Sequence, residues 1–156
     1  MILHSWVSKT HYPREEYARS VALEIQRLDL EGVIIVESPT RRDFGKLLGK
    51  YKAKWILDLH SGYKSHPSEE SRHLYSGLAH LFSDSDEALN MLRRWGKREY
   101  ALQMSQNQYF FLFMDAGYTK PNPSFIGVEL NELGGFSLEK SVEFVKKLCH
   151  FLYSET

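Results

Sequence analysis

The chain has 156 residues, of which 42% are hydrophobic and 13% aromatic, and its 20 basic side chains balance its 20 acidic ones. This length fits one domain, and the apolar content is sufficient for a buried core, which excludes a largely disordered chain. A net charge of zero gives no reason to expect the basic surface that is typical of nucleic-acid-binding proteins. The single cysteine, Cys149, excludes a disulfide framework within the chain and favours a buried structural thiol.

The sequence also gives no sign of a membrane-bound or exported protein. Its longest apolar runs fall far below the roughly 20 residues that a membrane-spanning helix needs. The segment Met1–Val7 is too short to be a signal peptide. We therefore expect a cytoplasmic protein, with neither a membrane nor a nucleic acid among its partners.

The first part of the chain alternates predicted strands and helices. Residues 1–7 are rich in β-formers and predict a short strand, and apolar side chains at helical spacing predict a helix over 14–28. Residues 33–36 form a run without a polar face, which indicates a strand buried on both sides. A turn is expected at Ser38-Pro39. A second helix over 43–51 and a third strand over 55–59 follow.

The second part continues the alternation with longer connections. Residues 61–71 contain glycine, proline and several serines, which is typical of a functional loop. A short strand is expected at 78–82, and a helix over 86–98 follows two capping residues, Asp84 and Ser85. An aromatic strand is predicted at 109–114. The last predicted strand covers residues 125–130, and Ser137 then caps a closing helix.

This order of elements predicts the fold class. The core face of the closing helix is expected to comprise Leu138, Val142, Val145, Cys149 and Leu152. Strands that alternate with helices through short connections indicate a parallel sheet with right-handed crossovers. We expect an α/β fold, with residues 1–156 forming a single three-layer domain. Its sheet would be mostly parallel but mixed, with helices on both faces.

Polar side chains at the predicted strand ends are the candidates for function, because open α/β sheets bind ligands beyond the carboxyl ends of their strands. These candidates are His11, Glu37, Asp58, His60 and Glu129. Histidines and carboxylates at neighbouring strand ends suit a metal-assisted hydrolase, since catalytic zinc takes nitrogen and oxygen ligands and leaves a position open for water. Glu129 stands in an otherwise apolar strand, where a buried carboxylate is costly unless it is paired, metal-bound or facing a cavity.

Each candidate also has a purely structural interpretation. His60 can be a loop histidine that caps a backbone group, and Asp58 can be a solvent-side strand residue instead of the carboxylate that orients a ligand histidine. His11 followed by Glu15 or Glu16 is a weak signal, because acidic residues favour helix N-termini in any case.

Taken in order, these motifs resemble those of the zinc-dependent amidohydrolases related to carboxypeptidases: succinylglutamate desuccinylase, aspartoacylase and the N-formylglutamate amidohydrolases. The resemblance covers roughly residues 1–135, and its most specific part is Asp58-Leu59-His60-Ser61, similar to the D-L-H-S motif. The other matching segments are Thr10-His11 with Glu15 and Glu16, Ser38-Pro39 with Arg41-Arg42-Asp43, and Ile126-Gly127-Val128-Glu129-Leu130-Asn131.

The resemblance implies a zinc-exopeptidase-like fold and about one zinc ion per chain. The implied ligands are His11, Glu15 and His60, with Asp58 orienting His60. The first motif departs from the family in its spacing and lacks the glycine after its histidine. Rival ligands therefore remain, namely His4 for His11, and Glu16 or Glu37 for Glu15.

The resemblance also implies a substrate class. Glu129 would be the general base, and Arg41 or Arg42 would pair with a substrate carboxylate, although the D-x-N-R pattern of the family is incomplete here. The expected partner is a small carboxylate-bearing molecule, either an N-acyl amino acid or a peptide C-terminus. The alternative is a non-catalytic binding domain on a degenerate hydrolase fold. In that case the aromatic segment 109–113 would form an interface within a homo-oligomer.

Overall fold

A computed structural model gives the fold of residues 2–6, 16–38, 54–61, 77–83, 85–96, 102–106, 124–131 and 136–155. The strands in these ranges are β1 (Ile2–Trp6), β2 (Ile34–Ser38), β3 (Trp55–His60), β4 (Ala79–Ser83), β5 (Leu102–Gln106) and β6 (Ser124–Leu130). The helices are α1 (Glu16–Arg27), α4 (Asp86–Gly96) and α6 (Leu138–Ser154). None of these helices is long and apolar enough to cross a membrane.

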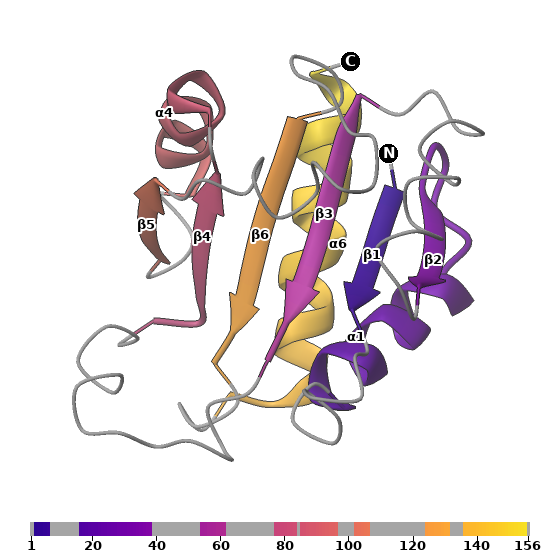
Figure 1. The fold of residues 1–156 in the computed structure, drawn as a ribbon. Coiled ribbons are helices and arrows are strands. Elements are labelled where there is room, and N and C mark those ends of the chain that lie inside the picture. Colours follow the sequence, from indigo (N-terminus) through magenta and orange to yellow (C-terminus); the bar gives the residue numbers. More distant parts are fainter. Residues whose placement is uncertain are drawn as a thin grey trace.

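The six strands form one mixed sheet in the order β2-β1-β3-β6-β4-β5 (Figure 1). Four of the five neighbouring pairs are parallel, and β4 runs antiparallel to β6. The predicted α/β class with a mostly parallel, mixed sheet is confirmed. The strand order reverses at β1, which has β2 on one side and β3 on the other. Such a reversal is where open α/β sheets bind ligands, beyond the carboxyl ends of the strands.

The three described helices pack together on one face of this sheet, with α6 behind β3 and β6 (Figure 1). The hydroxyl groups of Tyr17 in α1 and Ser141 in α6 are hydrogen-bonded at 2.8 Å. Trp95 in α4 stacks on Phe151 of α6, with ring centroids 5.3 Å apart. We expected helices on both faces, but within the described ranges only this face carries them. The helix expected over 43–51 lies outside those ranges.

Handedness explains why α1 and α4 share a face. Helix α1 connects β1 to β2, and α4 connects β4 to β5, each pair being parallel. The second pair runs in the opposite direction to the first, and the chain also moves toward the opposite edge of the sheet. Because both directions are reversed, right-handed crossovers put both helices on the same side.

Alternation along the strands puts the apolar core under the helices and the candidate polar side chains on the opposite face, which also carries Ile56 and Phe82. Toward the helices, the buried core side chains of the central strands are Trp55, Leu57 and Leu59 from β3, Ala79 and Leu81 from β4, and Ile126, Val128 and Leu130 from β6. Successive strand residues point to opposite faces. The intervening residues Asp58, His60, His80 and Glu129 therefore lie on the face turned away from α6.

Several element boundaries differ from those expected. Strand β2 continues through Glu37 and Ser38, so Glu37 lies inside the strand instead of after it, and the turn does not begin at Ser38. Strand β3 extends to His60. Strand β5 was not predicted, because its sequence Leu-Gln-Met-Ser-Gln lacks the apolar run that marks the inner strands. The aromatic strand predicted over 109–114 falls outside the described residues.

The closing helix begins where predicted but buries a different face. The Ser137 side chain accepts a hydrogen bond from the Lys140 amide at 3.2 Å and caps α6. Val145, Cys149 and Leu152 are buried as expected, and burial raises the pKa of the Cys149 thiol to about 12. Leu138 is 37% exposed, and Val142 is only partly buried. The centre of the buried face is formed instead by Ser141, Phe144 and Leu148.

Candidate functional site

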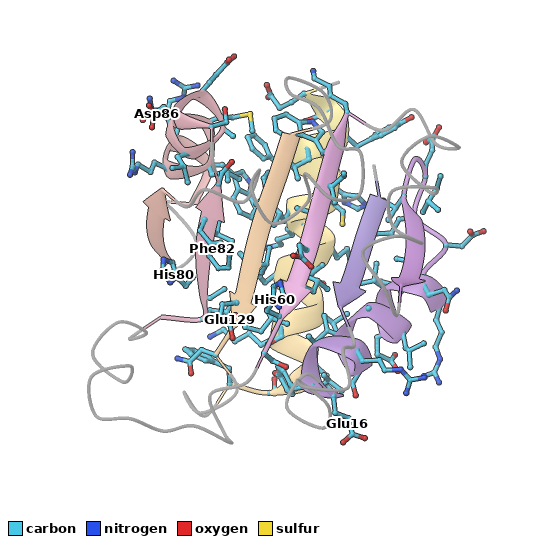
Figure 2. All side chains as sticks on the ribbon, viewed as in Figure 1. Glu16, His60, His80, Phe82, Asp86 and Glu129 are labelled. Atoms are coloured by element: carbon cyan, nitrogen blue, oxygen red, sulfur yellow. The ribbon has the colours of Figure 1, made fainter. Side chains whose placement is uncertain are left out.

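A row of three polar side chains crosses the sheet at the carboxyl ends of β3 and β6. His60 of β3 is the register partner of Glu129 in β6, and His80 of β4 is the partner of Glu129 on the other side. All three lie on the face turned away from α6 (Figure 2). Neighbouring strands are about 4.8 Å apart, so the row brings one imidazole to each side of the Glu129 carboxylate.

Asp58 and His60 form a hydrogen-bonded pair within β3. Being two residues apart, they share one face of the strand, and Asp58 Oδ2 lies 2.8 Å from His60 Nε2. Asp58 is only 2% exposed. A carboxylate accepts this bond from the N–H of Nε2, which leaves the lone pair of the neutral ring on Nδ1. Asp58 therefore orients the His60 ring, and Nδ1 is the ring nitrogen that can coordinate a metal.

The chemistry of this pair fits the metal that the resemblance implies. A zinc-ligating histidine usually donates its second ring N–H to a carboxylate or carbonyl oxygen. The two positions predicted from the D-L-H-S motif are thus joined in the arrangement expected for them. Within the described residues, no three histidine, cysteine or carboxylate side chains gather closely enough to hold a metal. His11 and Glu15 lie outside those residues, so the described part supplies His60 alone of the implied ligands.

Glu129 is half-buried in the middle of the row. Its neighbours Val128 and Leu130 point into the core under the sheet, so alternation turns Glu129 to the polar face. This placement keeps the carboxylate out of the apolar core. His60 is its register partner on β3, which brings the implied base next to an implied ligand.

The backbone register also bears on the rival ligands. His4 of β1 is the register partner of Asp58. Its position in the strand therefore belongs to the same face of the sheet as Asp58 and His60, in the row next to that of His60. Glu37 is the register partner of Ser5, and Ser5 pairs with Leu59. The position of Glu37 in its strand therefore belongs to the same face of the sheet as Leu59, opposite to that of Asp58.

Glu16, the other rival, is exposed. Figure 2 shows its carboxylate at the start of α1, directed away from His60.

Ser61 connects the D-L-H-S motif to the start of α1. Its side chain is buried, and its Oγ accepts a hydrogen bond from the Ala18 amide at 3.0 Å. Amides in the first turn of a helix lack partners within the helix, so Ser61 caps α1 from a distant strand. The start of α1 is therefore anchored beside the strand that carries His60.

His80 is the site residue that the sequence did not single out. It is half-buried, and burial lowers the pKa of its imidazole. Its ring meets the ring of Phe82 edge to face, with centroids 5.5 Å apart. A strand was predicted at 78–82, but its antiparallel pairing with β6 was not.

The remaining predicted residues, Arg41 and Arg42, also lie outside the described residues. Comparisons of the chain with protein-family models, with curated proteins and with solved structures found no match. The candidate site therefore rests on the row His60, Glu129 and His80, together with Asp58.

Proposed function

We propose that this chain is a zinc-dependent amidohydrolase with a zinc-exopeptidase-like fold, cleaving the amide bond of a small N-acyl amino acid or of a peptide C-terminus. The observation that carries the proposal is that two groups lie next to each other at the carboxyl ends of β3 and β6. One is His60 with its nitrogen held by Asp58 at 2.8 Å, and the other is Glu129, its register partner. An oriented ligand beside a base is the minimum that such a reaction requires.

In this proposal His60 Nδ1, His11 and Glu15 hold the zinc, and Asp58 fixes the His60 ring. When bound, zinc supplies a Lewis acid that polarises the scissile carbonyl and lowers the pKa of water. Glu129 accepts the proton of the attacking water and delivers it to the leaving nitrogen.

Arg41 or Arg42 binds the substrate carboxylate through the paired donors of a guanidinium. The substrate is therefore a small carboxylate-bearing molecule.

The test is to compare metal content and turnover in the wild type, His60→Ala, Glu129→Gln and Glu143→Gln. Glu143 is the matched control, because it is an exposed glutamate on α6, away from the site. We expect about one zinc per chain in all but His60→Ala. Glu129→Gln removes the base without removing a ligand, so its turnover of N-acyl amino acids should fall at least about 100-fold.

Two results would contradict the proposal. Full activity in Glu129→Gln would remove the assigned base. A wild-type protein that takes up no zinc, even when zinc is added back, would leave a non-catalytic binding domain as the function.

A further inference from the structure

We propose that His80 is a positioning residue of this site, whose imidazole donates a hydrogen bond to the Glu129 carboxylate and holds it for proton transfer. The inference rests on the proposed function for the task of Glu129, but not for the pairing itself. It starts from the register, in which Glu129 has His60 on one side and His80 on the other.

The antiparallel register brings His80 within reach of Glu129. Side chains directly opposite each other in such a pair have Cβ atoms about 4.5–5.5 Å apart. Ala79 and Leu81, the neighbours of His80, point into the core under the sheet. His80 therefore shares the polar face with Glu129 (Figure 2).

The surroundings of His80 favour a neutral, fixed ring. Phe82, two residues along β4, packs edge to face against it at 5.5 Å. Burial lowers the pKa of the imidazole, which favours its neutral form. On the far side of β4 its register partner is Gln103, which does not titrate. Glu129 is therefore the ionisable group that faces His80 from the neighbouring strands.

A neutral donor suits a general base better than a cation does. A positive charge beside Glu129 would lower the pKa of the carboxyl group and weaken it as a base. An uncharged imidazole can hold the carboxylate in one orientation without lowering its pKa in this way.

The pairing can be tested without substrate or metal, by NMR titration of the histidine rings in the full chain. The signal of His80 is assigned with His80→Gln, and its pKa is then compared in the wild type, Glu129→Gln and Glu143→Gln. A paired carboxylate raises the pKa of an imidazole, so in Glu129→Gln the pKa of His80 should fall further, by about one unit. In the exposed control Glu143→Gln it should not move. An equal His80 pKa in the wild type and Glu129→Gln would overturn the pairing, whether or not the protein is a hydrolase.

Turnover then tests the positioning role. His80→Gln keeps an amide donor and should retain most of the kcat, whereas His80→Leu should lose about 10-fold or more while its zinc content stays unchanged. Equal kcat values in His80→Leu and the wild type would overturn the role in catalysis.

Discussion

At the scale of single residues, Asp58 orients the His60 ring at the candidate site. A carboxylate that is 2% exposed loses most of its hydration, a cost that a strong hydrogen bond must offset. Its bond to His60 Nε2 offsets part of that cost and also selects the ring nitrogen left for coordination. The same contact therefore links the burial of Asp58 to the orientation of His60.

This contact leads to a prediction for Asp58→Asn. The amide keeps the shape of the side chain but removes the charge that fixes the His60 ring, so zinc affinity should fall about 10–100-fold. Competition with a chromogenic chelator measures the affinity. Asp86→Asn is the control, since Asp86 is exposed in the first turn of α4 (Figure 2). Equal affinities in the wild type and Asp58→Asn would show that the carboxylate does not support a ligand.

The sequence was informative about residues whose signal is local. Asp58 and His60 form a short motif at the end of one strand, and Glu129 is conspicuous in an apolar strand. His80 has no local signal, because its place beside Glu129 depends on the antiparallel pairing of β4 with β6. That pairing arises from the path of the whole chain, which periodicity within one strand does not encode.

At the scale of elements, α1 is held to the sheet by Ser61 as well as by its apolar side chains. The Ser61 hydroxyl accepts from the Ala18 amide, and Ala18, Val21 and Ile25 are buried against the sheet and α6. The helix thus has its position fixed at the end nearest the D-L-H-S motif.

We predict that Ser61→Ala lowers the free energy of unfolding by about 1 kcal/mol, because it leaves the Ala18 amide buried without its acceptor. Denaturant titration measures this change. Ser154→Ala is the control, since its exposed hydroxyl donates to the Phe151 carbonyl at the other end of the helix layer and its loss should matter little. Equal losses in the two variants would mean that the Ser61 contact does not anchor α1.

Elements with strong periodicity or caps were predictable, and those defined by the sheet were not. Ser137 identified the start of α6, yet Leu138 in its first turn is exposed, because the buried face of the helix begins only at Ser141. Strand β5 pairs at an edge with β4 alone, so its polar sequence is tolerated and gave no apolar signal. Strand β2, also at an edge, extends through Glu37 for the same reason.

At the scale of the whole molecule, the two faces of the described sheet have different roles. The face under α1, α4 and α6 contains the apolar core, and the opposite face carries the row of His60, Glu129 and His80. Because both right-handed crossovers lie on one side, all three helices share a single core. Substitutions in that core are expected to act on every described helix at once.

Phe144 tests this expectation, because it is fully buried in α6 and its ring lies 6.0 Å from that of Trp95 in α4. Phe144→Ala should cost about 3–5 kcal/mol, a large share of the roughly 5–15 kcal/mol that stabilises a typical domain. Leu138→Ala in the same helix should cost far less, since Leu138 is 37% exposed. Denaturation followed by tryptophan fluorescence and by far-ultraviolet circular dichroism should give coincident midpoints, both shifted in Phe144→Ala. Separate midpoints for the two signals would mean that α4 and α6 do not unfold as parts of one core.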